Sequence, residues 1–402
     1  MITAAHIAII LLVGLPLAYL GLLSILACFA RPDAARNAGR RRRFALVIPA
    51  YNEESCIAET VGSALAITYP VDAFDVVVVA DNCTDRTADR AQEAGARVIV
   101  RFSEHERSKG HALRWAFDRL LAEGYEAFAV CDADSTMSTN FLQVLNDTMH
   151  RGAGAVQCSD LVKPAPGAWS SEATRAGFLL YNVARPLGRV VLGCSAGLRG
   201  NGMGFTAATL RRVPWTAFGR AEDLEYGLIL LLNRIAVRFA PSASVVATMP
   251  TDARNAESQR ARWEGGRYPL IRRYAWPLLR ESVLRRSFRL FDAWTDLVTP
   301  PFTNLMVLAG AGAAADLIVL GIGLTTDPVF AALWLVACAC GIAHVVFGFA
   351  SAGKLAELMA LMKHVPFYIL WKVRLYARIT TTRDAQGWVR TTRERPTMAE
   401  KL

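Results

Sequence analysis

The segment Phe44-Ala-Leu-Val-Ile-Pro-Ala-Tyr-Asn-Glu-Glu54 decides the fold class, because a short apolar run ends abruptly in polar side chains. Residues 44–48 predict a buried strand, and the pattern from residue 54 to residue 67 predicts a helix. The same alternation repeats downstream, with strands expected at 75–80, 96–101 and 126–131 and helices at 84–94 and 110–123. Alternating strands and helices predict an α/β fold with a mainly parallel sheet and helices on both faces.

Polar residues follow three of these strands. Tyr51 to Glu53 follow the first strand, Asp81 and Asn82 follow the second, and Asp132 and Asp134 follow the fourth. Because ligands of such sheets bind beyond the carboxyl ends of the strands, we expect these residues in one site. A dinucleotide-binding oxidoreductase would need Gly-x-Gly-x-x-Gly after the first strand, and a P-loop ATPase would need a Walker A loop. The sequence has neither, which argues against both classes.

Two short motifs point to specific chemistry. Asp132-Ala-Asp134 can direct carboxylate oxygens at one hard cation whose other ligands are diphosphate oxygens and water; a solvated loop is the alternative interpretation. Gln259-Arg-Ala-Arg-Trp263 combines a guanidinium fork for phosphate oxygens with a flat ring on which a sugar can stack. A surface helix with one buried tryptophan is the alternative interpretation of this second motif.

Six motifs follow one another along the chain: Val47-Ile-Pro-Ala-Tyr-Asn-Glu-Glu54, Ala80-Asp-Asn-Cys-Thr-Asp85, Lys109-Gly110, Asp132-Ala-Asp134, Glu222-Asp223 and Gln259-Arg-Ala-Arg-Trp263. Their order, spacing and strand-end placement resemble the membrane-bound glycosyltransferases of family 2. That family includes cellulose, chitin-oligosaccharide and hyaluronan synthases and is related to ceramide glucosyltransferases. The resemblance covers about residues 44–263. It implies a GT-A type fold, a nucleotide-diphosphate sugar donor (most often a UDP-sugar), Mg²⁺ or Mn²⁺ as cofactor, and inversion at the anomeric carbon.

The resemblance also implies which side chains bind the donor. The nucleoside would be held by Tyr51, Glu53 and Asp81. The diphosphate would be held by Lys109, Gln259 and Arg262. The metal ion would be held by Asp134, with Asp132 behind it. Three of these residues also have ordinary structural explanations: a surface lysine for Lys109, a first-turn helix acid for Glu53 and a helix cap for Asp81.

On the acceptor side, the resemblance makes Trp263 a sugar platform and makes Glu222-Asp223 the source of the general base. We expect Asp223 to be that base, at the start of a helix over residues 223–232, with Glu222 as the next candidate. The first turn of a helix stabilises a charged carboxylate, which would leave Asp223 deprotonated. The sequence departs from the family pattern at Ala221, where many relatives have Thr, and at residues 200–204, Gly-Asn-Gly-Met-Gly.

Three apolar segments are long enough to cross a membrane: residues 7–30, 301–324 and 329–352, the last two forming a hairpin. Arginines follow the first segment, and residues 353–402 contain ten Lys or Arg against four Asp or Glu. The positive-inside rule therefore places the middle of the chain and the C-terminal tail in the cytoplasm. Asp316 and His344 fall within expected spans, where we expect structural contacts inside the helix bundle.

Two further segments have an amphipathic, interfacial pattern. In residues 279–298, the apolar side chains Leu284, Phe288, Phe291, Trp294 and Val298 recur at helical spacing, which predicts a helix lying flat on the membrane. Residues 365–379 mix aromatic and basic side chains and predict an interfacial helix or a tilted fourth span. The expected organisation is a transmembrane helix (1–30), a catalytic domain (31–275), an interfacial helix (279–299), a hairpin (301–352) and a basic tail (353–402).

Composition fits a globular domain joined to several membrane segments. Of the 402 residues, 53% are hydrophobic, the net charge is +10, and the mean hydropathy is +0.26. The arginines flank apolar segments rather than forming an aromatic-interleaved patch, so we expect no nucleic-acid partner. The eight scattered cysteines predict reduced packing residues.

We therefore expect an inverting transferase in the plasma (inner) membrane, with its catalytic domain in the cytoplasm. It would use a UDP-sugar to extend a polysaccharide, oligosaccharide or lipid-linked acceptor. The alternatives are a single transfer to a lipid acceptor and, in another class, a transporter with a cytosolic regulatory domain. The expected partners are the nucleotide-sugar donor, the acceptor and membrane lipids, with a homo-oligomer or a separate export channel for a long product.

Overall fold

The computed structural model describes residues 2–31, 39–163, 169–248, 253–324 and 327–362. The expected interfacial segment at residues 365–379 lies outside this part of the chain. Two compact units are present. One unit contains Pro32–Phe178 and Ser195–Tyr274, and the other contains Met1–Arg31, Leu179–Cys194 and Ala275–Arg378. We call them the sheet unit and the helical unit.

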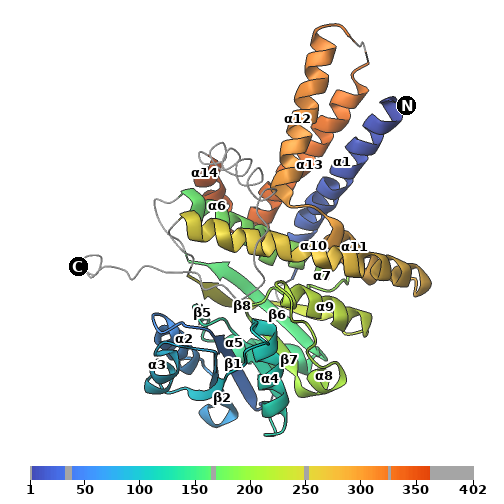
Figure 1. The fold of residues 1–402 in the computed structure, drawn as a ribbon. Coiled ribbons are helices and arrows are strands. Elements are labelled where there is room, and N and C mark those ends of the chain that lie inside the picture. The colour runs from blue at the N-terminus through green and yellow to red at the C-terminus, as the bar shows by residue number, and fades with distance from the viewer. Residues whose placement is uncertain (1, 32–38, 164–168, 249–252, 325–326, 363–402) are drawn as a thin grey trace, which may run out of the picture. The chain divides into compact units, whose positions relative to one another are not determined.

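The sheet unit is built on one eight-stranded sheet with the order β3-β2-β1-β4-β7-β6-β8-β5 (Figure 1). β1 pairs in parallel with both β2 and β4, and β2 pairs in parallel with β3, so the four strands expected from sequence form one parallel block. β6 also pairs in parallel with β8, and β5 pairs antiparallel with β8. β7 runs antiparallel to β4 and β6. The strands are β1 (Phe44–Ala50), β2 (Phe74–Asp81), β3 (Arg97–Arg101), β4 (Ala127–Val130), β5 (Ser135–Met137), β6 (Ala155–Val162), β7 (Met203–Thr206) and β8 (Val237–Ala247).

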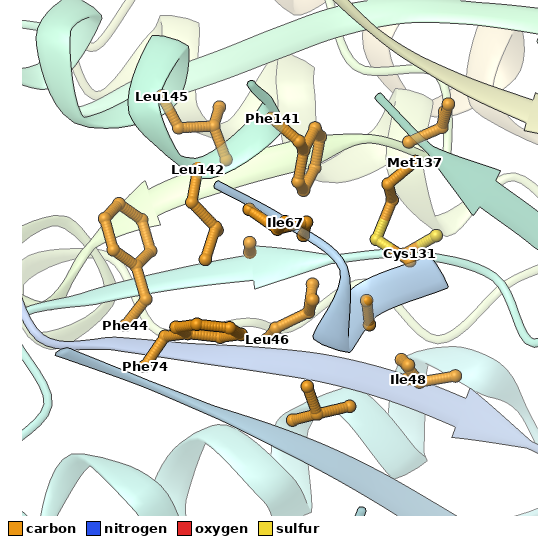
Figure 2. Close-up of a cluster of buried hydrophobic side chains, with 14 of the residues drawn as sticks. Phe44, Leu46, Ile48, Ile67, Phe74, Cys131, Met137, Phe141, Leu142 and Leu145 are labelled. Carbon is orange, nitrogen blue, oxygen red and sulfur yellow. The ribbon is translucent and has the colours of Figure 1, made fainter. Parts of the chain in front are cut away.

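Helices cover both faces of this sheet, as expected. β1 is buried along its whole length, which explains why its sequence is continuously apolar. On one face, Phe44, Leu46 and Ile48 pack with Phe141 and Leu142 (Figure 2). Burying each such side chain contributes roughly 1.5–3 kcal/mol. On the opposite face, Phe128 of β4 meets Phe117 edge-on, with ring centroids 5.5 Å apart. The helices of this unit are α2 (Ile57–Leu65), α3 (Thr87–Glu93), α4 (Lys109–Leu121), α5 (Phe141–His150), α6 (Trp169–Phe178), α8 (Ala207–Arg212) and α9 (Glu222–Leu232), with a short 3₁₀ helix, η1 (Val71–Ala73).

Asparagines shape the chain beyond the first two strands. Asn52 and Asn82 have φ angles of 55° and 52°, a left-handed conformation that asparagine tolerates better than most residues. The Asn52 side chain accepts a hydrogen bond from the Thr84 N–H at 2.7 Å. The two loops are thereby joined at the carboxyl edge of the sheet.

The helical unit contains the three described helices that are long and apolar enough to cross a membrane: Ala4–Ala27 of α1 (Ile2–Ala27), α12 (Phe302–Gly321) and α13 (Val329–Ser351). They match the three segments expected from sequence. Figure 1 shows α12 and α13 as a hairpin beside α1. A Cβ at Gly21 would lie 2.8 Å from the Cys340 carbonyl oxygen, so glycine permits close contact between α1 and α13. His344 is buried and its Nδ1 lies 2.7 Å from the Ser24 hydroxyl, while His6 lies 3.1 Å from Asp316.

The helical unit also includes a segment from the middle of the chain, η2 (Leu179–Ala184, a π-helix) and α7 (Arg185–Val191). The structure thus interrupts the catalytic domain expected at residues 31–275. Arg185 and Arg189 form buried ion pairs with Asp296 and Asp292 at 2.5 and 2.7 Å, and the Tyr19 hydroxyl donates to Asp292 at 2.9 Å. These interactions attach the segment to its own unit, and they are not visible in the hydrophobic pattern.

The amphipathic segment expected at residues 279–298 is two helices rather than one. α10 (Ala253–Leu284) ends, Arg286 adopts a φ angle of 47°, and α11 (Phe288–Val298) begins. Within the helical unit, Phe288 and Phe291 are exposed whereas Asp292 is buried. Asp292 and Asp296 are therefore on the buried side of α11, where arginines of α7 neutralise them, whereas Arg289 is exposed. The last described helix is α14 (Leu355–Met362).

Candidate active site

Lys109 lies at the centre of a group of carboxylates. Its Nζ donates to Asp132 Oδ1 at 2.5 Å and to the Gly200 carbonyl oxygen at 2.6 Å, and lies 3.8 Å from Glu222 Oε1. Burial lowers the pKa of this lysine, but Asp132 and Glu222 outweigh burial and the net shift is upward. The Lys109 side chain is only 17% exposed, so the surface-lysine explanation is wrong.

Local sequence explains how this lysine is placed. Ser108 caps α4, and its hydroxyl accepts from the His111 N–H at 3.3 Å. At Gly110 a Cβ would lie 2.1 Å from the Ala217 carbonyl oxygen, so only glycine allows the helix to start so close to the neighbouring loop. The Lys109-Gly110 motif therefore combines a charge with the close packing that positions it.

Asp132 and Asp134 follow β4 directly, as expected. Asp134 Oδ1 accepts from the Ser135 hydroxyl at 3.0 Å, and the Asp132 N–H donates to Asn201 Oδ1 at 3.0 Å. Two carboxylates suit a hard cation such as Mg²⁺ or Mn²⁺ that takes its remaining ligands from substrate phosphates and water. Across the described ranges, no group of three or more His, Cys, Asp or Glu side chains is arranged to hold a metal ion.

Glu222 and Asp223 occupy the first turn of α9. Burial raises the pKa of Glu222 to about 8, Lys109 opposes the shift, and Asp223 adds to it. The backbone N–H of Leu224 lowers the pKa of Asp223, as the helix terminus predicts, but burial dominates and the net shift is upward. The position of Asp223 at a helix N-terminus, taken alone, therefore predicts the wrong direction for the shift of its pKa.

Asp81 is fully buried at the end of β2. Its Oδ1 accepts from Arg101 at 2.7 Å and from Asn82 at 3.0 Å, while its Oδ2 has no hydrogen-bond partner among the described residues. Burial raises the pKa of Asp81, and Arg101 opposes the shift. Because α3 is capped at Arg86, the helix-cap explanation of Asp81 is wrong.

Tyr51 and Glu53 lie in the loop between β1 and α2. The Glu53 N–H donates to the Thr87 hydroxyl at 2.7 Å, and its carboxylate accepts from the Cys56 thiol at 3.2 Å. Glu53 precedes the first residue of α2, Ile57, so it is not a first-turn acid of that helix.

The Gln259, Arg262 and Trp263 motif lies on the backbone of α10, and its side chains are outside the described part of the chain. Their expected roles stay predictions.

Several buried residues of this site were absent from the sequence prediction. Arg101 pairs with Asp81, Gln157 and Asp160 lie on β6, and Asn201 contacts the Asp132–Ser135 segment. Asp160 is buried close to the carboxylate group, and burial raises its pKa well above the usual range. The sequence offered one indication of these residues: the unusual Gly-Asn-Gly sequence at residues 200–202, which contains Asn201.

Comparisons with known proteins add to this geometry. The family model described as "Glycosyltransferase like family 2" matches residues 41–266. The probable glycosyltransferase YdaM of Bacillus subtilis (strain 168) is 25% identical over 271 residues, which cover 65% of this chain and 63% of YdaM. The hyaluronan synthase of Streptococcus pyogenes is 34% identical over 110 residues, 26% of this chain and 26% of that protein. The chain thus spans less than two thirds of the length of these relatives.

Among solved structures, the mannosyltransferase PcManGT from Pyrobaculum calidifontis, in complex with GDP-Man and Mn²⁺, matches with a TM-score of 0.54. The match covers 86% of this chain and 98% of that chain at 19% sequence identity, which supports similarity of fold.

Proposed function

This chain belongs to glycosyltransferase family 2 and has a GT-A-like fold, and from that premise we propose that it is a metal-dependent, inverting hexosyltransferase. Its donor is a nucleotide-diphosphate sugar, in the first instance a UDP-sugar. The observation that carries the proposal is the contact of the half-buried Lys109 with Asp132 and Glu222 at the carboxyl edge of the sheet.

The chemistry of sugar transfer matches these side chains. The acceptor hydroxyl oxygen bonds to the anomeric carbon, the bond from that carbon to the diphosphate oxygen breaks, and the hydroxyl proton passes to a carboxylate. The departing nucleoside diphosphate gains negative charge, which the Lys109 ammonium stabilises. Arg262 and Gln259 are proposed to close over the same phosphates, and Trp263 is proposed as the acceptor platform.

Asp132 and Asp134 are the residues that would hold Mg²⁺ or Mn²⁺. When bound, the ion neutralises charge that develops on the diphosphate. Asp134→Ala should therefore transfer sugar far more slowly than the wild type, and full turnover in excess EDTA would contradict the proposal.

The nucleoside is proposed to contact Tyr51, Glu53 and Asp81. The buried Oδ2 of Asp81, which has no hydrogen-bond partner within the described part of the chain, supports this assignment, because a buried acceptor without a partner is costly and a nucleobase N–H can satisfy it.

Asp223 is proposed as the general base, with Glu222 as the alternative. Both side chains are close enough to Lys109 for their charges to interact with it. Asp223→Asn keeps the shape of the side chain and removes its proton-accepting ability, so the transfer rate should fall about 10²-fold or more while UDP affinity is retained. Near-normal transfer by Asp223→Asn would move the role to Glu222, for which Glu222→Gln is the matched test.

The decisive experiment incubates the purified protein with a panel of nucleotide-sugars and measures released nucleotide. Release from one donor, dependent on divalent cation and lost in Asp134→Ala, supports the proposal. A wild-type protein that releases nucleotide from no donor, with or without added acceptors, contradicts it.

The product is proposed to be a short oligosaccharide or a lipid-linked sugar, made at the cytoplasmic face of the plasma membrane. The three candidate spans among the described residues are few helices from which to form a polysaccharide channel within one subunit. A long polymer would therefore need a homo-oligomer or a separate export channel. High-molecular-weight polysaccharide inside vesicles that contain this protein alone, as a monomer, would contradict the proposal.

A further inference from the structure

We propose that Asn201 is a positioning residue that fixes the Asp132–Asp134 carboxylate pair for cation binding, acting from the turn Gly200-Asn201-Gly202. The inference rests on the proposed function, because it gives this turn a role in the metal-dependent site of a sugar transferase. It concerns a segment where the sequence departs from the family pattern.

The backbone of the turn is held by the strands on either side. The Gly202 N–H donates to the Val130 carbonyl of β4 at 3.1 Å, and the Gly202 carbonyl accepts from the Cys158 N–H of β6 at 2.9 Å. Gln157 Nε2 donates to the Asn201 carbonyl at 2.6 Å. Three hydrogen bonds from two strands leave the turn little freedom to shift.

Glycine is required on both sides of Asn201. Gly200 and Gly202 have φ angles of 84° and 69°, a region that strains other residues. A Cβ at Gly202 would also lie 2.9 Å from the Val245 side chain. The Gly-Asn-Gly sequence therefore places the Asn201 side chain in one defined orientation.

The Asn201 amide bridges both ends of the segment that contains the two aspartates. Its Oδ1 accepts from the Asp132 N–H at 3.0 Å, and its Nδ2 donates to the Ser135 hydroxyl at 2.9 Å. Ser135 in turn donates its single hydroxyl hydrogen to Asp134 Oδ1 at 3.0 Å. The donors and acceptors match at each step, so Asn201 orients Asp132 through its backbone and Asp134 through Ser135.

The surroundings fix which way the amide faces. Asn201 is 4% exposed, and its Nδ2 lies 3.4 Å from the buried carboxylate of Asp160. Turning the amide over would place its oxygen against that carboxylate and its NH₂ group against the Asp132 N–H. The contact of the NH₂ group with the Asp132 N–H would set two donors against each other, which makes the observed orientation the stable one.

The same turn also lies next to Lys109 and Asp223. The Gly200 carbonyl accepts from Lys109, and a Cβ at Gly200 would lie 3.2 Å from Asp223 Oδ2. Asn201 is therefore one residue from the lysine contact and beside the carboxylate proposed as base. A small displacement of this turn changes the spacing between the cation-binding pair and the acceptor side.

The test compares Asn201→Ala and Ser135→Ala with the wild type and with Asn233→Ala. Asn233 is a matched control, because it is an exposed asparagine whose side chain bonds to the Ile229 carbonyl at the far end of α9. Three quantities are measured: Mn²⁺ affinity by electron paramagnetic resonance at saturating UDP, UDP affinity in excess EDTA, and the thermal unfolding midpoint.

Loss of a residue that orients a metal ligand typically weakens metal binding about 10–100-fold, and we expect this range for Asn201→Ala. Ser135→Ala should show a smaller loss, because it leaves the Asp132 contact in place. UDP affinity in EDTA should not change in either variant, and Asn233→Ala should match the wild type throughout.

A merely structural role gives a different result: Asn201→Ala would unfold at a lower temperature but bind Mn²⁺ as the wild type does, and that would overturn the inference. If Asn201→Ala does not fold, Ser135→Ala decides, and unchanged Mn²⁺ affinity in that variant overturns it. If the wild type is active and one of these two results is obtained, only the proposed role of Asn201 is refuted. The proposed function of the enzyme is unaffected. A wild type that neither binds Mn²⁺ nor releases nucleotide refutes the proposed function, and this role with it.

Discussion

Replacing Lys109 by methionine tests the electrostatic centre of the site directly. Methionine keeps the length and apolar stem of the side chain and removes its charge. The structure predicts a loss of folding stability, because the substitution deletes the cation that contacts Asp132 at 2.5 Å and Glu222 at 3.8 Å. It also leaves the Gly200 carbonyl without its donor.

The magnitude follows from these distances. At 2.5 Å, with an effective dielectric constant of about 20, the Lys109–Asp132 ion pair is worth roughly 7 kcal/mol before desolvation. Glu222 keeps its proton up to a pKa of about 8, so it adds little to this energy at neutral pH. The Asp132 side chain is 37% exposed, so the net cost of removing Lys109 lies between that of a surface pair, about 0–1 kcal/mol, and that of a buried pair, roughly 3–5 kcal/mol. A cost of roughly 2–4 kcal/mol corresponds, in a domain of this size, to a midpoint lower by roughly 4–16 °C.

The assay is thermal unfolding of the purified protein in detergent, without nucleotide or divalent cation. Lys163→Met is the matched control, because Lys163 is 38% exposed and pairs with exposed Glu59 at 2.8 Å. Such surface pairs contribute about 0–1 kcal/mol. A Lys109→Met midpoint no lower than that of Lys163→Met would refute the electrostatic reasoning. Retained sugar transfer by Lys109→Met would, separately, refute the role of this lysine at the diphosphate.

Three further predictions concern other parts of the molecule. Folded, ligand-free protein keeps a proton on Glu222 up to a pKa of about 8, whereas an unfolded glutamate loses it near pH 4.3. Wild-type stability should therefore fall as pH rises across this window, and the midpoint advantage of Glu222→Gln should grow between pH 5 and pH 8.5; an advantage independent of pH would contradict this. Arg189→Met leaves the buried Asp292 and Asp296 without their shared arginine and should cost about 3–5 kcal/mol in chemical denaturation. Arg280→Met, which removes an arginine that is 60% exposed, should cost about 0–1 kcal/mol. Reporters fused after Arg43 and at Leu402 should be cytoplasmic, and Thr326 should be labelled from outside; external proteolysis near Arg43 in intact cells would reverse the assigned orientation.

Sequence patterning predicted the elements whose environment is uniform along their length. β1 is apolar at every position because helices cover both of its faces, and the three spans are apolar because no polar solvent is expected around them. The six motifs were sufficient to identify the family, since all but Gln259–Trp263, which lies within α10, combine a residue type with a fixed position after a strand or at a helix start. Lys109-Gly110 is such a case, in which the glycine marks close packing and the lysine marks the charge.

Patterning could not predict contacts that depend on which distant residues meet. The polar side of α11 looks solvent-exposed in the sequence, yet Asp292 is buried because Arg189, 103 residues earlier, neutralises it. Asp223 looks like a stabilised first-turn carboxylate, yet burial raises its pKa.

The sequence by itself thus determined the fold class, the three apolar helices and the residue types of the site. Only the tertiary structure decided the charge balance around Lys109 and the role of Asn201. The reason is physical: hydrophobic periodicity records how much of each residue is buried, whereas ion pairing and hydrogen bonding depend on distances of a few ångströms between residues far apart in the chain.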